Sequence, residues 1–317
     1  MDLRAVAGLF CGVGIFLFSV VQMSESMKNL FEKKGERLIQ KLSKNRFSGV
    51  LCGAGLTGIV QSSAAVTVTA VSLADCGKLS LSSCVGIIMG SNIGTTVTGV
   101  LAALNFSFAA PFLIVFGAFL ALVSKNEKLK NAAVFLCALG LLFVGISTMK
   151  DSAQELDKNG FLSSFFLRFS SKLSGVLCGF VSTAIAQSSS ATVGVLQSLV
   201  SVGAIKRENA VFIICGQNIG ATVPTLLSSI KAEEKAKAAA VFHLLFNLFG
   251  TAGVLFLSLL FPLSKPFEVF KSGEGFVSAV HVLFNVLCTA AVFPFSIRVT
   301  KLSKKLVSFF GGHKIDK

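Results

Sequence analysis

Two short polar motifs interrupt a chain that is otherwise apolar. The first lies in "GIVQSSAAVTV" and contains Gln61, Ser62 and Ser63; the second lies in "AIAQSSSATVG" and contains Gln187, Ser188, Ser189 and Ser190. Uncharged amide and hydroxyl groups can both donate and accept hydrogen bonds, which suits the binding of small ions. Nucleophilic catalysis by Ser62 or Ser188 would need a partner base, and neither motif carries one. We therefore expect an ion-binding site and not an enzyme.

A second motif, G-x-N-I-G, also occurs twice. Its copies, "MGSNIGTT" and "CGQNIGAT", supply the further candidate ligands Asn92, Thr95, Thr96, Asn218 and Thr222. Gly90 and Gly94 lie one helical turn apart, as do Gly216 and Gly220, and such pairs predict close backbone packing. Both motifs recur after 126 residues without a gap, so the chain contains an internal repeat.

The composition identifies an integral membrane protein. Apolar residues make up 53% of the 317 residues and charged residues only 14%, against about 25% charged in soluble domains. The net charge of +14 does not indicate a nucleic-acid partner, because Lys and Arg gather at the ends of apolar segments, as membrane topology requires. The eight cysteines form no C-x-x-C pair, so we interpret them as packing residues rather than metal ligands or disulfides.

Each half of the repeat has the same order of segments. An apolar span precedes a charged amphipathic stretch, a Q-S-S segment and two further spans. The spans are expected at 6–23, 82–104 and 109–123, then at 132–149, 209–230 and 236–262, with a last one at 275–297. The charged stretches, 24–46 and 150–172, are expected on the membrane surface. This divides the chain into a first repeat (1–131), a second repeat (132–262), and a last span with a basic tail (263–317).

The Q-S-S segments cannot be ordinary spans. Residues 51–74 are long enough to cross a bilayer, yet their middle holds glycines and the Q-S-S motif. Polar backbone at that depth is tolerated only inside protein or beside a watery cavity. We therefore interpret each segment as a re-entrant hairpin of two half-helices with the motif at its tip. The fold class is then an all-α polytopic membrane protein with about seven spans and two hairpins.

This interpretation makes the two halves inverted, because each then crosses the membrane an odd number of times. If residues 24–46 are cytoplasmic, most of the 29 Lys and Arg residues also lie on the cytoplasmic side, as the positive-inside rule requires. The N-terminus is then outside and the C-terminus cytoplasmic, in the plasma membrane. Inverted repeats with broken helices are typical of secondary transporters. Packing of helices through small residues alone would explain one such segment, but not two copies that also carry Gln and Asn.

The motifs resemble those of the type II sodium-dependent phosphate cotransporters and their bacterial relatives. The resemblance rests on the duplicated Q-S-S, on "IIMGSNIGTTVT" with its copy "IICGQNIGATVPT", and on H-x-x-F-N, present as "HLLFN" and "HVLFN". It implies sodium-coupled symport of inorganic phosphate, with substrate and Na⁺ held between the two hairpins and no organic cofactor. Sodium is expected at Gln61, Ser62, Gln187, Ser188, Ser189 and Ser190. The C-terminal PhoU-like domain of many bacterial relatives is expected to be absent.

Several points stay open in the sequence. Ala64 stands where the family commonly has a third Ser, and Gln217 replaces Ser91 in the second copy, so the two halves need not bind the same ion. Another small oxyanion, or an anion channel of the same fold, remains an alternative. His243 and Asn247 share a helix face, as do His281 and Asn285, which favours an interhelical His–Asn hydrogen bond that fixes packing over proton sensing or anion contact. The lipid bilayer is an expected partner, and a homodimer is one candidate for the oligomeric state.

Overall fold

The described part of the computed structural model comprises residues 2–104, 106–168 and 170–310, and it consists of helices joined by turns and short loops. No strand occurs in these ranges, as expected for an all-α membrane protein. The first half contains α1 (Leu3–Leu42), α2 (Arg46–Val60), α3 (Ser63–Asp75), α4 (Leu81–Ala103), η1 (Ser107–Ala109) and α5 (Ala110–Val123). The second half contains α6 (Glu127–Asp157), α7 (Phe161–Leu167), α8 (Lys172–Ala186), α9 (Ser189–Ser201), α10 (Arg207–Gly220), α11 (Val223–Ser228) and α12 (Glu234–Leu260). The chain continues through η2 (Lys265–Phe267), α13 (Gly273–Val292), η3 (Phe293–Phe295) and α14 (Ser296–Phe310).

The helices of the two halves follow the sequence repeat. Three helices of the first half, α2, α3 and α4, begin 126 residues before α8, α9 and α10, and the turns after α3 and α9 each contain a glycine with positive φ, Gly77 and Gly203. The repeat differs where α4 runs unbroken to Ala103, because its counterpart is divided into α10 and α11 just before Pro224. Proline lacks the N–H that a continuous helix would use there.

Six helices in the described ranges are long and apolar enough to cross a membrane, one fewer than the sequence predicts. The difference lies at 109–123. There α5 has 14 residues, about 21 Å of helix, against about 30 Å of bilayer hydrocarbon. It ends at Val123 because the polar residues 124–126 form the turn into α6.

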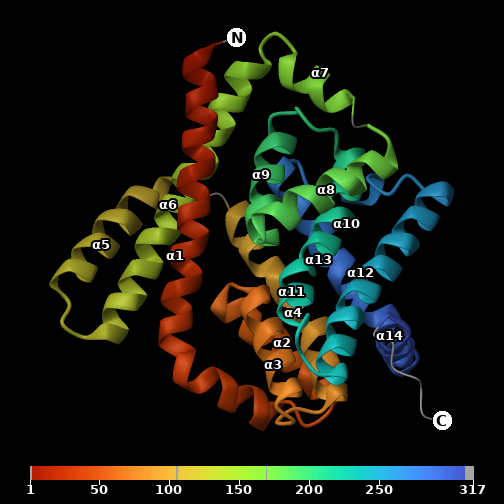
Figure 1. Cartoon of the computed structure of the whole chain (residues 1–317). Coiled ribbons are helices and arrows are strands. Elements are labelled where there is room, and N and C mark those ends of the chain that lie inside the picture. Colours follow the sequence, from red (N-terminus) through yellow and green to blue (C-terminus); the bar gives the residue numbers. More distant parts are fainter. Residues whose placement is uncertain (1, 105, 169, 311–317) are drawn as a thin grey trace.

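The first charged stretch belongs to the same helix as the first span. α1 continues through this stretch to Leu42, since no proline interrupts it, and its C-terminal part turns away from the direction of the span (Figure 1). The position of this stretch on the membrane surface stays a prediction. In the second half, α6 continues to Asp157, and Gly160, with φ 67°, separates it from the short α7.

On one side of the molecule, α1, α5 and α6 form a group beside the Q-S-S helices (Figure 1). α1 and α6 run in opposite directions, because Gly12 lies against Met149 while Phe16 lies against Gly145. Their apolar side chains, among them the fully buried Phe16 and Leu142, form one of the hydrophobic clusters of the core.

The first helix of each Q-S-S pair is fixed to a neighbouring span by backbone contact. Gly49 of α2 lies against Ser83 and Gly58 against Val97, so α2 runs parallel to α4. A Cβ at Gly90 would collide with the carbonyl of Val50, and a Cβ at Gly216 with that of Val176. The close backbone approach that the glycine spacing predicts is therefore confirmed in both halves.

The contacts of α12 and α13 fix the directions of the other long helices. α13 runs opposite to α4, since Ser278 donates to the Gly99 carbonyl and Thr289 to the Met89 carbonyl. α12 runs opposite both to α13 and to α10 with α11. The pairs in contact are Phe246–Cys288 and Gly250–Phe284 for α13, and Thr251–Cys215 and His243–Thr225 for α10 and α11. It follows that α4 and α10, which are counterparts in the repeat, run in opposite directions.

Candidate ion-binding site

Each Q-S-S motif breaks the helix that contains it. Gln61 ends α2 and Gln187 ends α8, both with left-handed backbone, at φ 59° and 52°. Among the described residues they alone have positive φ without being glycine. Ser62 and Ser188 then cap α3 and α9, their hydroxyls accepting from backbone N–H groups one turn on. Left-handed backbone costs a residue with a side chain about 1–2 kcal/mol, so local bonds must hold both glutamines in place.

At the first break, the bonds of Gln61 are visible. Its side chain is buried, its amide Nε2 donates to the carbonyl of Gly58, and its Oε1 accepts from the Thr98 hydroxyl at 2.7 Å. Thr98 also accepts from the Ser190 hydroxyl at 3.2 Å. One hydroxyl of α4 therefore joins the two Q-S-S motifs, which lie far apart in the sequence.

The second break is more open. Gln187 is exposed and Ser188 half-buried, whereas Ser189 and Ser190 are buried. The repeat places Pro224 where the first half has Thr98, and proline offers no hydroxyl to Gln187. The two glutamines share a backbone conformation but not a set of partners.

Asn92 belongs to a second buried network, beside the first. Its amide nitrogen lies 3.2 Å from Nε2 of His243, and Nδ1 of His243 lies 3.3 Å from the Thr225 hydroxyl, which in turn bonds Thr67 at 2.9 Å. An amide nitrogen only donates, so Nε2 accepts and Nδ1–H donates to Thr225. The histidine of the first H-x-x-F-N motif thus ties α12 to α4 and α11, while Asn247 donates to its own helix at the His243 carbonyl.

Most of the remaining candidate residues make only local bonds. Ser63 also contacts a second helix, because its carbonyl lies 3.5 Å from the Ser91 hydroxyl of α4. The other four are buried and donate to a carbonyl three or four residues back: Thr95 to Ser91, Thr96 to Ile93, Asn218 to Ile214 and Thr222 to Ile219. Their spare lone pairs leave them able to accept from, or coordinate, a further group.

Several buried polar atoms have no hydrogen-bond partner. In the described part of the chain they include Oε1 of Gln197 and of Gln217, Oδ1 of Asn247 and of Asn285, and both ring nitrogens of His281. Ser91, the counterpart of Gln217, does have a partner, since it bonds Thr57 at 2.7 Å. Unpaired amide oxygens inside a membrane protein are costly unless an ion or water uses them. No group of three or more His, Cys, Asp or Glu residues that could hold a metal ion occurs in the described ranges.

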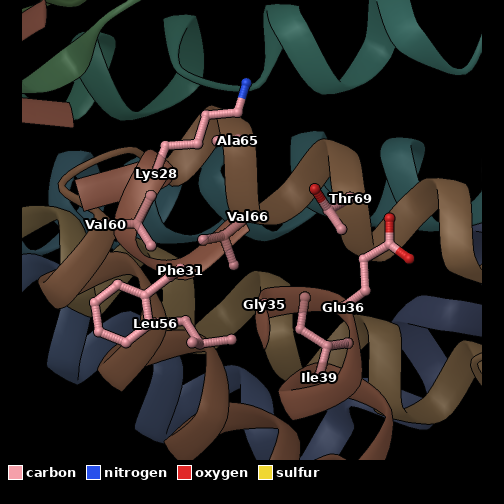
Figure 2. Close-up of a pocket in the computed structure, with 10 residues that line it drawn as sticks. All are labelled: Lys28, Phe31, Gly35, Glu36, Ile39, Leu56, Val60, Ala65, Val66 and Thr69. Carbon is pink, nitrogen blue, oxygen red and sulfur yellow. The ribbon is translucent and has the colours of Figure 1, made fainter. Parts of the chain in front are cut away.

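A pocket of 240 Å³ lies beside the first break, between the C-terminal part of α1 and the pair α2–α3. Figure 2 shows the charged ends of Lys28 and Glu36 at its edges and the side chains of Phe31, Leu56 and Val66 between them. Val60 and Ala65, which flank the motif, also line it. The acid Asp75, at the far end of α3, is not part of this site; it accepts from the backbone N–H of Glu233 at 2.7 Å.

The ends of the broken helices give the site its electrostatics. The N-termini of α3 and α9, each of 13 residues, begin at the motifs and present free N–H groups with partial positive charge. The helices α2 and α8 end at the same two motifs, and their C-termini present carbonyl oxygens with partial negative charge. An anion suits the first pair of ends and a cation the second.

Residues 15–151 and 153–261 match the Na⁺/Pi-cotransporter family. The chain belongs to this family. It is a membrane protein, and the duplicated Q-S-S and G-x-N-I-G motifs and the first H-x-x-F-N motif lie inside the matched ranges, whereas the second H-x-x-F-N motif, at 281–285, lies beyond them. Membership of the Na⁺/Pi-cotransporter family thus agrees with the resemblance expected from the sequence.

The chain is also similar to individual proteins. The chain is 28% identical over 245 residues to the protein YqeW of Bacillus subtilis, a match over 76% of this chain and 80% of YqeW. It is 23% identical over 301 residues to the "Putative inorganic phosphate export protein YjbB" of Salmonella typhimurium, a match over 94% of this chain but only 55% of that protein. A 95-residue segment is 36% identical to the sodium-dependent phosphate transport protein 2A of Oryctolagus cuniculus, covering 28% of this chain and 15% of that protein. No solved structure matches.

Sequence reasoning missed three residues that link the elements of this site. Thr98 lies inside the motif "IIMGSNIGTTVT" and one helical turn beyond Thr95, a spacing that could have indicated it. Thr67 and Thr225 also lie inside quoted motifs, but the repeat matches them with Val193 and Gly99, so the duplication does not indicate them. His243 was weighed as a packing residue, and its bond to Asn92 is an interhelical His–Asn contact of that kind.

Proposed function

We propose that this protein is a secondary active transporter that couples the movement of inorganic phosphate to that of Na⁺ across the plasma membrane. The observation that carries the proposal is the joining of the two Q-S-S breaks through Thr98, within a chain of the Na⁺/Pi-cotransporter family. Phosphate would lie at the N-termini of α3 and α9, near Ser62, Ser63 and Ser188–Ser190. Sodium would use Gln61, Gln187, the serine hydroxyls and the carbonyls at the ends of α2 and α8.

We infer that each Q-S-S pair is a re-entrant hairpin. Since α2 runs parallel to α4 and a short turn joins the end of α3 to the start of α4, α3 returns toward the side from which α2 enters. Neither half-helix is long enough to cross alone: α2 has 15 residues and α3 has 13. The opposite directions of α4 and α10 support inverted repeats over 1–131 and 132–262.

The same arrangement supports a topology with the N-terminus outside and the C-terminus cytoplasmic. The hairpin α2–α3 then enters from the cytoplasm and α8–α9 from outside, so that the tips meet within the membrane. Part of the predicted basic tail, 311–317, lies outside the described residues. Alternating access would expose the tips first to one side and then to the other, and the pocket beside the first break would serve the cytoplasmic side.

A second candidate function, phosphate export rather than uptake, differs from the first in the direction of net transport. The name printed for the Salmonella relative is that of a phosphate export protein, whereas that of the rabbit relative is sodium-dependent phosphate transport. Export and uptake need the same site, because a symporter works in whichever direction the combined gradients drive it. A different small oxyanion, or an anion channel, would also use this fold.

The test is phosphate flux in proteoliposomes that contain the purified protein. Saturable flux that follows an imposed Na⁺ gradient in both orientations is expected, and competition by sulfate and arsenate separates phosphate from other oxyanions. Gln61→Ala and Gln187→Ala should each abolish the coupled flux, while Gln154→Ala, an exposed glutamine on α6, should leave it unchanged. Flux that neither saturates nor depends on Na⁺ would support a channel instead.

A further inference from the structure

A small polar cavity of 140 Å³ lies away from the Q-S-S breaks, at the Ala103 end of α4. It lies between η1, α6 and α13, and the ionisable residues that line it are Lys150, Asp151 and Glu274. Its other walls include the buried Ala102 and Phe143. Its volume has room for several water molecules, since each occupies about 30 Å³ in the liquid.

An ion pair joins two helices across this cavity. Nζ of Lys150 on α6 lies 2.6 Å from Oε1 of Glu274, the second residue of α13. The side chains of Lys150 and Glu274 are 34% and 11% exposed, whereas those of a second pair at the C-terminal end of α6, Lys158 and Glu155, are 67% and 44% exposed. A buried carboxylate needs a partner or water, so Lys150 and Glu274 can part only if the cavity is hydrated.

A seam of hydrogen bonds continues from this pair toward the site. Gln197 of α9 is fully buried, and its amide nitrogen donates to the Gly99 carbonyl at 2.8 Å and to the Ser278 hydroxyl at 2.7 Å. Ser278 also donates to the Gly99 carbonyl, at 2.8 Å. The same amide lies 3.5 Å from the carbonyl of Glu274. Three helices, α4, α9 and α13, therefore meet on one carbonyl group.

The seam shares its two helices with the contact that joins the motifs. Gly99 directly follows Thr98 on α4, and Gln197 lies two helical turns beyond Ser190 on α9. Separation of α9 from α4 would thus break the Ser190–Thr98 and Gln197–Gly99 bonds together. Oε1 of Gln197 is buried without a partner, so the closed seam leaves one acceptor unsatisfied that water would satisfy on opening.

The seam has no counterpart at the equivalent positions of the repeat. The residue that matches Gln197 in the first half is Val71, a buried apolar side chain, and Gly99 is matched by Thr225, which bonds Thr67 and His243. Helix packing that only repeats the duplicated fold would not need a polar residue on one side and an apolar one on the other.

We propose that the cavity is the extracytoplasmic access vestibule of the ion route and that the Lys150–Glu274 pair, with the Gln197 seam, is its gate. This inference rests on the proposed function. In the closed gate, Glu274 neutralises Lys150. When the pair parts and water enters, the ammonium group of Lys150 is free to attract an oxyanion toward the N-terminus of α9.

Cross-linking tests whether the pair must part. In the double variant Lys150→Cys/Glu274→Cys, oxidation should abolish phosphate flux and a reductant should restore it. The matched control is Lys158→Cys/Glu155→Cys on the same helix, with the single-cysteine variants and the wild-type protein under the same oxidant as references for the native cysteines. If the cross-linked double variant transports phosphate as fast as the same variant does after treatment with the reductant, the gate is overturned.

Thiol labelling tests the gate independently of the transported ion. Ala102→Cys places a thiol in the wall of the vestibule, where it should react slowly with a water-soluble maleimide. Glu274→Gln should speed this reaction and Glu155→Gln should not. If Ala102→Cys is labelled at the same rate with Glu274→Gln as with Glu155→Gln, the gate is overturned even if the protein transports phosphate. If Glu274→Gln speeds the labelling but the protein does not transport phosphate, the gate is retained and the proposed cargo is refuted.

Discussion

Replacement of Thr98 by valine tests the joint between the two halves most directly. Valine keeps the shape of the side chain but removes the hydroxyl that donates to Gln61 and accepts from Ser190. Both partners would then be buried without this bond, Gln61 at 7% exposure and Ser190 at 8%. A buried polar group left unsatisfied costs about 1–3 kcal/mol. A loss of that size in the state that joins the tips corresponds to about 5–150-fold in an equilibrium between two states.

The assay is the initial rate of sodium-driven phosphate flux in proteoliposomes. Thr98→Val should reduce the rate within that range, and Thr98→Ser, which keeps the hydroxyl, should restore most of it. Thr148→Val is the matched control, because Thr148 bonds only a carbonyl of its own helix, α6. Thermal unfolding in detergent shows whether each variant is folded. Wild-type flux in Thr98→Val, or equal loss in the valine and serine variants, would refute the role of this hydroxyl.

Three further predictions concern packing, the second network and topology. Gly90→Ala should lower the free energy of unfolding by about 1–3 kcal/mol, because the new Cβ meets the Val50 carbonyl. Gly55→Ala is the control and should not lower it, because Gly55 has open space around it. Equal melting temperatures of the two variants would contradict the packing argument. His243→Leu should reduce phosphate flux more than His243→Gln does, because leucine removes one hydrogen bond from Asn92 and one from Thr225, each of which keeps its other partner. Indistinguishable rates would remove His243 from the network. Cysteines placed at the exposed Lys78 and Lys206 should be labelled by an impermeant thiol reagent from opposite sides of the membrane, and labelling of both from one side would exclude inverted hairpins.

The sequence could predict features that depend on neighbouring residues. The G-x-x-x-G spacing indicates close backbone contact, which is observed, and Gln-Ser in an apolar segment indicates the position where the helix breaks. The internal repeat carries these predictions from one half to the other. Family membership and the all-α architecture could likewise be predicted from the motifs and the hydropathy.

Features that depend on contacts between distant helices could not be predicted in this way. The bonds of Thr98 with Ser190 and of Asn92 with His243 join segments far apart in the chain, and many hydroxyls in this sequence could have taken such roles. The length of α5 and the continuity of α1 were also missed. Apolar composition does not show where a helix ends, and a charged stretch forms as good a helix as an apolar one.

The contacts at Gly90 and Gly216 have a mechanical consequence. Sliding α2 along α4 by one residue would press the Val50 carbonyl against the side chain of Met89 or Ser91, so the two helices move as one stiff body, and α8 with α10 likewise. Hinges between such rigid pairs would lie outside these contacts, at the breaks before Ser62 and Ser188 and at the turns that contain Gly77 and Gly203. In the proposed transporter, the conformational change would therefore be concentrated at these few breaks and turns, while each helix pair keeps its packing.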